Sequence, residues 1–411
     1  MSELTLRGGR IVTPAGMCDG DVVVRDGRIA GVVDGGVGAD HRGGGTHHSV
    51  LGEAASGVID LDGRWVLPGF IDLHVHGGGG AQFNTDDAAE VHDAARFHAQ
   101  HGTTALLATT VSAPPEELLA ALGAIGEAVN APVAGTAAVI GAHLEGPFLS
   151  RAWPGAMDAA TFLDPEKLLT KQLLAAGPVR STTIAPELPG ALESIARFAE
   201  AGALVSLGHS DARFAHAEAA VAAGARAVTH AYNAMRPLHH RDPGLLGAAL
   251  DLPDLHCEVI CDGVHVDPVA VRLLQRVKGP ARTLLVTDAI EATGLPDGDY
   301  RLGGRAVTVT DGRATLAGSE TIAGATLTMD RALRNAVVFC DASLADAARM
   351  AATTPAELLG IADRKGSIAP GLDADLVILE PDLTLAAVLV RGAWARPPLW
   401  QRSSVPGATR A

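Results

Sequence analysis

Apolar and polar residues alternate over short stretches at both ends of the chain, a pattern typical of β-strands with one buried face. Residues 20–33, GDVVVRDGRIAGVV, hold two such stretches around an Asp-Gly pair, which predicts a hairpin turn. Residues 366–395, GSIAPGLDADLVILEPDLTLAAVLVRGAWA, show the same pattern of short strand-like stretches separated by turn residues. We therefore predict one small β-sandwich domain built from residues 1–67 and 367–411.

Residues 35–57 interrupt the N-terminal strands with a glycine-rich segment that contains His41, His47 and His48. Segments of this composition favour loops. The three histidines could bind a metal, but no carboxylate or cysteine is spaced to complete a site with them. We predict a flexible surface insertion here.

Between the two ends, eight apolar runs alternate with alanine-rich segments of helical character. This alternation predicts βα units around a parallel sheet, and eight units close a (β/α)8 barrel. We therefore predict a catalytic barrel over residues 68–366. The runs are GFIDLHVH (69–76), TTALLATTV (103–111), TAAVIGAHLEG (136–146), VRSTTIAPE (179–187), ALVSLGHS (203–210), ARAVTHAYN (225–233), HCEVICDG (256–263) and TLLVTDAI (283–290).

The carboxyl ends of the strands hold the active site in such a barrel, and here those ends are rich in histidine and carboxylate. His74 and His76 are two apart on the first run, so both imidazoles point the same way, and four glycines follow them. The polar residues at the ends of the eight runs are His74 and His76, Thr109 and Thr110, Glu145, Glu187, His209, His230, Asp262 and Asp288.

Five of these residues, His74, His76, Glu145, His209 and His230, form a candidate metal site. Imidazoles with one carboxylate are the ligands of a catalytic divalent ion, typically zinc, with a position left open for water. Such an ion lowers the pKa of bound water from about 15.7 to about 7. Any one of the histidines alone would more simply be a hydrogen-bonded strand residue, but their accumulation on several strands favours the metal site.

Two further residues are candidates for the chemistry itself. Asp288 is placed to accept a proton and pass it to a leaving group, and its alternative role is to cap the following segment. His265, in CDGVHVD, is the candidate to polarise a carbonyl, with Asp262 as an orienting neighbour or a turn residue.

The formal net charge of −15 restricts the partners. Nucleic acid and anionic membranes demand a basic face, so we expect neither. An anionic substrate must then be held by a few placed groups, and Arg241 with the main-chain N–H groups around Asn233 and Ala234 is the candidate set.

The N-terminus lacks the basic start and apolar stretch of a signal peptide, so we expect a cytoplasmic protein. The four cysteines show no C-x-x-C spacing, which favours reduced thiols.

Ten motifs, taken in order, resemble those of the N-acetylglucosamine-6-phosphate deacetylases of the amidohydrolase superfamily. The likeness covers nearly the whole chain apart from residues 35–57, and HLEGP and THxxNAM are far more specific than H-x-H. The motifs are PGFIDLHVHG, GTTALLATTVS, HLEGPFLS, LGHSDA, THAYNAM, RDPGLLGAAL, CDGVHVDP, LVTDAIEATG, LAGSETIAGATLTMD and KGSIAPGLDADLVIL.

The resemblance implies a metal-dependent hydrolase of amino sugar metabolism that removes the acetyl group of N-acetylglucosamine 6-phosphate. Homodimers are usual in this family. Zinc is the expected ion, in one or two copies, and iron, cobalt and manganese are alternatives. The implied roles are a metal on Glu145, His209 and His230, a second metal on His74 and His76, acid–base catalysis by Asp288, contact with the amide carbonyl by His265, and phosphate binding by Arg241 and the Asn233-Ala234 backbone.

One position departs from the family pattern. After HLEGP the family has a loop of the form KGAH whose histidine contacts the sugar, whereas this chain has RAWPGAMD with Met157 in that place. A thioether cannot donate a hydrogen bond to a hydroxyl. Two alternatives therefore stay open: deacylation of another N-acyl amine, such as a different amino sugar or an N-acyl amino acid, and a non-catalytic assembly protein on the same fold. The complete set of ligands argues against the second.

Overall fold

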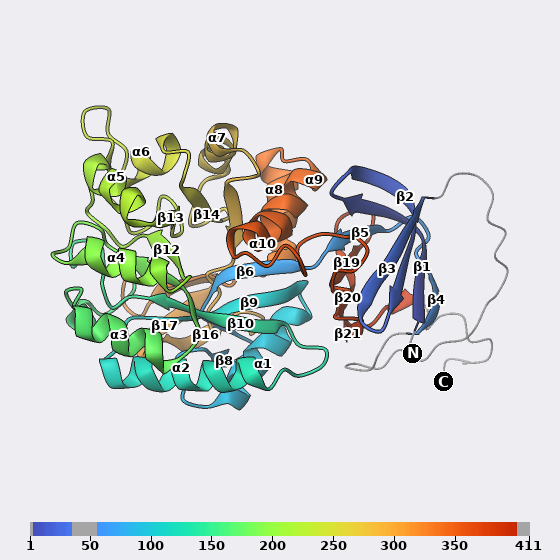
Figure 1. The fold of residues 1–411 in the computed structure, drawn as a ribbon, viewed down its shortest axis with the longest axis horizontal. Helices are drawn as coiled ribbons and strands as arrows, with labels where there is room; N and C mark the ends of the chain where they lie inside the picture. Colours follow the sequence, from blue (N-terminus) through green and yellow to red (C-terminus); the bar gives the residue numbers. More distant parts are fainter. Residues whose placement is uncertain (1–2, 35–55, 401–411) are drawn as a thin grey trace.

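The computed structural model describes residues 3–34 and 56–400, which form a helix-covered barrel beside a smaller sheet (Figure 1). The segment that we predict to be an insertion, with His41, His47 and His48, lies outside the described residues except at its last two positions. Within the described ranges, no helix combines the length and the apolar character needed to cross a bilayer.

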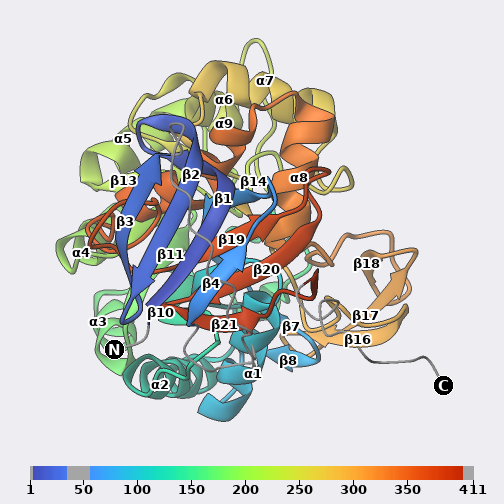
Figure 2. The ribbon, with the colours of Figure 1, turned by 90° about the vertical axis from the view of Figure 1, so that its right-hand side faces the viewer.

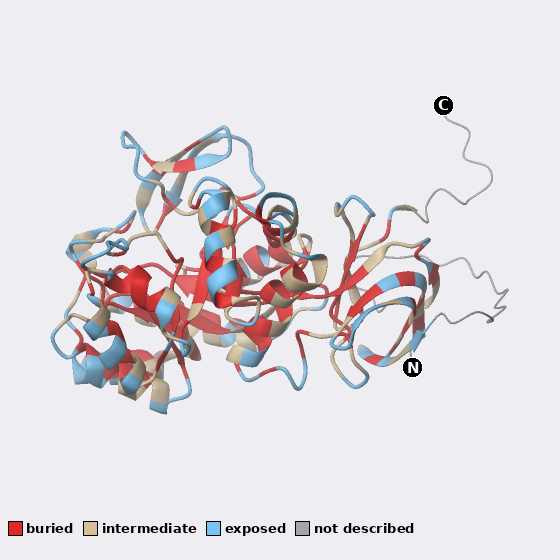
Figure 3. Ribbon diagram, turned by 90° about the horizontal axis from the view of Figure 1, so that it is seen from above, coloured by how far each residue is buried: buried red, intermediate tan, exposed pale blue. Residues whose placement is uncertain are grey.

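Each of the eight apolar runs forms one strand of the barrel, and the strands pair in chain order, which confirms the predicted fold. Every residue of the first two strands is buried, as expected for parallel strands covered on both faces. Figure 3 shows buried residues along the barrel and exposed residues on the outer helices. The strands are β6 (Phe70–Val75), β9 (Thr103–Thr110), β10 (Ala138–Glu145), β11 (Val179–Ile184), β12 (Leu204–Leu207), β13 (Ala225–Val228), β14 (His256–Ile260) and β15 (Thr283–Val286).

The barrel closes between its first and last strands through contacts just beyond β15. The Asp288 N–H donates a hydrogen bond of 2.9 Å to the His74 carbonyl. The fully buried Asp72 carboxylate accepts a hydrogen bond of 2.6 Å from the Thr287 hydroxyl. This seam ties the H-x-H strand to the segment that carries Asp288.

Amphipathic helices cover the outside of the barrel. In α4, for example, Ala191, Ser194, Ile195 and Phe198 are buried at the spacing that places them on one helical face. The helices are α1 (Ala88–Ala99), α2 (Pro115–Asn130), α3 (Lys167–Ala176), α4 (Ala191–Glu200), α5 (Phe214–Ala223), α6 (Gly244–Asp251), α7 (Pro268–Lys278), α8 (Met329–Cys340), α9 (Leu344–Ala348) and α10 (Thr354–Leu358), with short turns η1 (Ala159–Thr161) and η2 (Arg349–Thr353).

The smaller sheet combines both ends of the chain, as predicted, and its first strands face the viewer in Figure 2. Asp26 and Gly27 have φ of 50° and 77°, which suits the tight turn between β2 and β3. The domain boundaries at residues 67 and 366 stay a prediction. The strand order is β21-β20-β19-β5-β1-β2-β3 with β4 beside β1, and the bounds are β1 (Glu3–Thr13), β2 (Gly16–Arg25), β3 (Arg28–Asp34), β4 (Gly57–Asp60), β5 (Trp65–Pro68), β19 (Leu376–Leu379), β20 (Leu385–Val390) and β21 (Ala393–Arg396).

A second, three-stranded antiparallel sheet is inserted between β15 and α8, and the sequence analysis did not predict it (Figure 2). It consists of β16 (Gly298–Leu302), β17 (Arg305–Thr310) and β18 (Arg313–Leu316). Its buried residues pack with Val111, Leu149 and Met157 from the loops at the barrel mouth. The insertion therefore builds one side of the mouth.

The loop after H-x-H packs closely against α1, which explains its run of glycines. It contains the two-residue strands β7 (Gly77–Gly78) and β8 (Ala81–Gln82). A Cβ on Gly78 would lie 2.5 Å from Cδ1 of Phe97. The buried His98 ring donates from Nε2 to the Gly77 carbonyl at 2.8 Å, and its Nδ1 has no partner among the described residues.

We expect His98 to make the protein less stable in mild acid. Burial lowers the pKa of His98 to about 4, whereas in the unfolded chain its pKa is about 6.5. Below pH 6.5 the unfolded chain binds a proton that the folded protein does not, so the free energy of unfolding falls until about pH 4. The loss should reach about 2 kcal/mol at pH 5, measurable by urea unfolding at pH 7.5 and pH 5.0.

The matched variant is His98→Gln, whose amide can donate to the same carbonyl without titrating. Between pH 7.5 and pH 5.0, the free energy of unfolding of this variant should fall by about 2 kcal/mol less than that of the wild type. Equal pH dependence in the two proteins would show that His98 does not cause the effect.

Candidate active site

The barrel brings the polar strand ends together at one mouth, as the topology requires. Glu145 is the last residue of β10, and His209, His230 and Asp288 each follow a strand by two residues. These three have positive φ of 46°, 27° and 51°, a conformation that costs free energy for residues other than glycine. Such strain is concentrated at functional sites, where the surrounding fold holds it in place.

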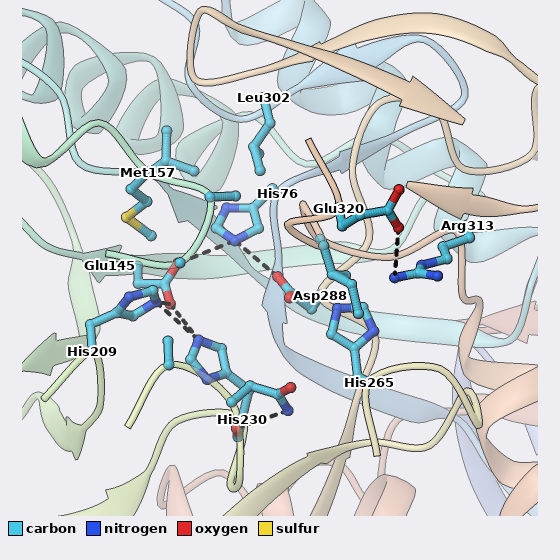
Figure 4. Close-up of a pocket in the computed structure, with 17 residues that line it drawn as sticks. His76, Glu145, Met157, His209, His230, His265, Asp288, Leu302, Arg313 and Glu320 are labelled. Atoms are coloured by element: carbon cyan, nitrogen blue, oxygen red, sulfur yellow. Dashed lines mark hydrogen bonds and ion pairs between the residues drawn. The ribbon is translucent and has the colours of Figure 1, made fainter. Parts of the chain in front are cut away.

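Glu145 lies between two pairs of imidazoles, and Figure 4 shows it between His76 on one side and His209 and His230 on the other. Its Oε1 is 3.2 Å from Nε2 of His209 and 3.0 Å from Nε2 of His230. Its Oε2 is 3.4 Å from Nε2 of His74 and 3.3 Å from Nε2 of His76. The single carboxylate therefore joins two groups of donors.

Asp288 completes the second group. Its Oδ1 is 3.1 Å from Nε2 of His76 and 3.5 Å from Nε2 of His74. All the residues of both groups are buried, with Asp288 the most accessible at 8%. Asp288 thus contacts the cluster and also borders the open pocket.

Acceptors outside the cluster fix the orientation of three rings. Nδ1 of His74 lies 3.1 Å from the Glu258 carboxylate, Nδ1 of His76 lies 3.2 Å from the Thr109 carbonyl, and Nδ1 of His209 lies 3.0 Å from the Trp153 carbonyl. Carboxylates and carbonyls only accept hydrogen bonds, so each Nδ1 carries the proton. A neutral ring of this tautomer directs the Nε2 lone pair into the cluster.

This arrangement fits a divalent cation. Nε2 of His74 is 3.2 Å from Nε2 of His76, and the same distance separates Nε2 of His209 and His230. Nitrogen lone pairs that face one another at these distances repel, and so do the two carboxylates. A positive charge among them removes the repulsion. Imidazole nitrogens with carboxylate oxygens are the donors that zinc and similar ions prefer.

The pKa values also indicate a place where positive charge is stabilised. Burial opposes protonation of His74, but Glu145 and Glu258 outweigh it and raise the pKa of His74 well above its ordinary value. Burial likewise opposes ionisation of Asp288, but the hydrogen bond to His76 and the neighbouring imidazoles lower the pKa of Asp288. Asp288 is therefore a carboxylate at neutral pH.

His265 lies on the same mouth and is oriented by Asp262. Its Nδ1 is 2.7 Å from Oδ2 of Asp262, while Oδ1 of Asp262 accepts the main-chain N–H of His265 at 2.8 Å. Asp262 therefore combines the two roles considered for it, orienting neighbour and turn residue. Burial opposes protonation of His265, but the carboxylate outweighs it and raises the pKa of the ring.

A cavity of about 350 Å³ opens onto the cluster. Met157 and Leu302 lie on the side near His76 and Glu145, whereas Arg313 and Glu320 lie on the other side, beyond Asp288 and His265 (Figure 4). The cavity is lined by His76, Val111, Glu145, Gly155, Ala156, Met157, His209, His230, Asn233, Ala234, His265, Asp288, Leu302, Arg313, Glu320, Ile322 and Gly324.

Arg241 and Glu187, both considered from the sequence, do not line this cavity and have no contact with the cluster among the described interactions. Arg241 is exposed on the loop before α6, and its Nη1 is 2.7 Å from Nε2 of the neighbouring His240. Glu187 accepts hydrogen bonds from the Ser210 hydroxyl at 2.7 Å and the Asp211 N–H at 2.6 Å. Glu187 therefore anchors the loop that carries His209.

Sequence reasoning missed Glu258, Arg313 at the start of β18 and Glu320 in the loop after it. Glu258 is fully buried in β14, and the signal for it was a carboxylate inside the otherwise apolar run HCEVICDG. Nothing comparable pointed to Arg313, because the strand β18 that it begins was not recognised, and Glu320 lies in the quoted motif LAGSETIAGATLTMD but was given no role in the site. Arg313 is the only lysine or arginine that lines the cavity in the described part of the chain.

Comparison with known proteins gives a consistent result. The Amidohydrolase family matches residues 65–395. The N-acetylglucosamine-6-phosphate deacetylase of Lysinibacillus sphaericus is 36% identical over 95% of this chain and 97% of its own length, and the N-acetylgalactosamine-6-phosphate deacetylase of Escherichia coli O157:H7 is 38% identical over 82% and 89%. A solved structure of the Mycobacterium smegmatis N-acetyl-D-glucosamine-6-phosphate deacetylase, in complex with N-acetyl-D-glucosamine-6-phosphate, is 36% identical with a TM-score of 0.88, covering 97% of this chain and 100% of that one.

Proposed function

Because this chain belongs to the amidohydrolase family, we propose that it hydrolyses the acetamide of N-acetylglucosamine 6-phosphate to glucosamine 6-phosphate and acetate. The observation that carries the proposal is the convergence of Glu145 and four imidazoles beside Asp288 at the barrel mouth. A small-molecule substrate, rather than nucleic acid or an anionic membrane, accords with the net charge of −15. The non-catalytic alternative requires lost ligands, and all the expected ligands are present.

We infer that zinc is the resident ion, since the family implies a divalent metal and the donors are imidazoles and carboxylates. Glu145, His209 and His230 would hold one ion, and His74 and His76, with the other oxygen of Glu145, would hold a second. A bound divalent ion supplies Lewis acidity, which polarises the acetyl carbonyl and activates water.

Hydrolysis adds water across the amide: a C–O bond forms, the C–N bond breaks, and the amine must leave with an extra proton. Asp288, a carboxylate at neutral pH, accepts the proton of the attacking water and passes it to the departing nitrogen. Asp262 accepts the Nδ1–H of His265 and favours the protonated ring, whose Nε2–H can then donate to the acetyl oxygen.

We assign the substrate phosphate to Arg241 and the main chain at Asn233 and Ala234. Asn233 and Ala234 line the cavity. Arg241 is close to them in the sequence, but it is exposed and does not line the cavity. Arg241 can therefore reach the anion by movement of its loop or from a second copy of the chain, which favours a homodimer. Light scattering of the purified protein tests the dimer directly.

Arg241→Ala should raise KM for the phosphorylated sugar by a factor equivalent to roughly 2 to 4 kcal/mol and leave the poor activity on N-acetylglucosamine almost unchanged. Steady-state kinetics on both sugars measures this. The comparison variant is Arg313→Ala, because Arg313 is the arginine that lines the cavity. If Arg313→Ala loses the preference for the phosphorylated sugar over N-acetylglucosamine while Arg241→Ala keeps that preference, the assignment to Arg241 is wrong.

The function is tested by initial rates on a small panel of substrates: N-acetylglucosamine 6-phosphate, N-acetylgalactosamine 6-phosphate, N-acetylglucosamine and several N-acetyl amino acids. The first should have the highest kcat/KM. N-acetylgalactosamine 6-phosphate is the second candidate, favoured by the relative of that specificity and by Met157 in the sugar-contacting loop. Preference for an N-acetyl amino acid would overturn the proposal.

A further inference from the structure

Two buried cysteines contact each other at the end of strand β14. Sγ of Cys261 lies 3.7 Å from Sγ of Cys340, and the two residues are 2% and 3% exposed. Both are free thiols, and neither lines the catalytic cavity. A disulfide bond is about 2.05 Å long, so the sulfur atoms of this cysteine pair need to approach by about 1.7 Å to form one.

The fold holds the two members of the cysteine pair beside each other. Cys261 follows the last residue of β14, and Cys340 is the last residue of α8. Nδ2 of Asn335 in α8 donates a hydrogen bond of 2.8 Å to the Cys261 carbonyl. Nη1 of Arg272 in α7 donates one of 2.7 Å to the carbonyl of Phe339, next to Cys340. The strand end that carries one thiol is therefore tied to the helix that carries the other.

Cys340 is the member of the pair that a small oxidant can reach. It lines a second cavity, of about 220 Å³, which Cys261 does not line. The hydrogen bond from the Cys261 thiol lowers the pKa of Cys340, although burial and the Asp341 carboxylate oppose this, and Arg272 acts in the same direction as the hydrogen bond. The thiolate is the form that reacts with peroxides, so Cys340 is the thiol that is oxidised first.

The cysteine pair is covalently linked to the catalytic machinery. Cys261 precedes Asp262, whose Oδ2 lies 2.7 Å from Nδ1 of His265 and whose Oδ1 accepts the main-chain N–H of His265 at 2.8 Å. A disulfide pulls Cys261 toward α8 and so disturbs the residue bonded to it. We propose that the cysteine pair is an oxidation site whose disulfide lowers turnover by displacing Asp262 and, through it, His265. The effect on turnover rests on the proposed function, whereas formation of the disulfide does not.

Hydrogen peroxide is the oxidant that the proposal requires. The Cys340 thiolate attacks one peroxide oxygen, so an S–O bond forms, the O–O bond breaks, and the departing hydroxide takes up a proton to become water. The Cys261 sulfur then attacks the sulfenic acid, so the S–S bond forms, the S–O bond breaks, and a second water leaves with the Cys261 proton. The two sulfur atoms together lose one electron pair, which reduces the peroxide to water.

The experiment treats the full-length protein, with its metal bound, with hydrogen peroxide. Peptide mapping without reduction should join the peptides of Cys261 and Cys340, with a mass about 2 Da below the sum of the two reduced peptides. The value of kcat should fall about ten-fold, because His265 loses its orientation toward the acetyl oxygen. Tris(2-carboxyethyl)phosphine, which reduces disulfides, should restore it.

Variants assign the loss to the pair. After peroxide, Cys340→Ser and Cys261→Ser should each retain the kcat that they have before treatment. Cys340→Ala, which buries no hydroxyl, is the second variant if serine disturbs folding, and thermal unfolding identifies any such loss. The matched control is Cys257→Ser, which removes another buried thiol of β14, whose Sγ lies 3.6 Å from the Ala249 carbonyl. It should lose kcat as the wild type does.

Three results would overturn the proposal: no joined peptide in the treated wild type, a joined peptide with unchanged kcat, or an equal loss of kcat in the wild type and the Cys340 variants. The peptide map requires no substrate. Its result is therefore separate from the outcome for the proposed function.

Discussion

Replacing Asp288 by asparagine is expected to lower kcat by about 10² or more while substrate binding and metal content persist. Asparagine keeps the shape of the side chain and its place 3.1 Å from Nε2 of His76, but it has no carboxylate to take up a proton. The departing amine would then lack its proton donor. The measurements are kcat, KM and metal content, and the acidic limb of the pH–rate profile should change in the same variant.

The matched control is Asp330→Asn, which changes a partly buried carboxylate that pairs with His101 away from the cavity. It should retain normal kcat. Near-normal turnover of Asp288→Asn with its metal in place would contradict the assigned role. Asp262 would be tested next, because it contacts His265, whereas Glu187 lies outside the cavity and anchors the loop at Ser210 and Asp211.

Replacing Glu145 by glutamine is expected to remove metal and activity together. Both oxygens of Glu145 face imidazole nitrogens, so the change removes a negative charge from the centre of the cluster and directs an amide N–H toward one of the ring pairs. Metal affinity should fall by more than the 10- to 100-fold typical of residues that only orient ligands. Elemental analysis after dialysis and kcat/KM measure the two losses.

Glu187→Gln is the control for this change, since Glu187 follows the neighbouring strand β11 but does not face the cluster. It should keep its metal. Full metal content and full activity in Glu145→Gln would remove Glu145 from the ligand set. Retained metal with lost activity would instead indicate that the imidazoles alone hold the ion.

The fold was largely predictable because each barrel strand is a local feature of the sequence. A parallel strand buried on both faces must be a continuous apolar run, and eight such runs separated by amphipathic segments leave few alternatives to a closed barrel. The inserted sheet from β16 to β18 was missed because its short strands, with one exposed face, resemble an ordinary long loop within a barrel.

By itself, the sequence determined the barrel, the joining of both chain ends in one sheet, and the set of residues at the strand ends. These depend on periodicity and on the rule that parallel strands end at a common edge. Only the tertiary structure decided how those residues are arranged. It placed Glu145 between two pairs of rings, recruited Glu258 as the partner of His74, left Arg241 outside the cavity and brought Arg313 into it. The physical reason is that hydrogen bonds and cavity walls join side chains far apart in the chain, and no local pattern records which of them will meet.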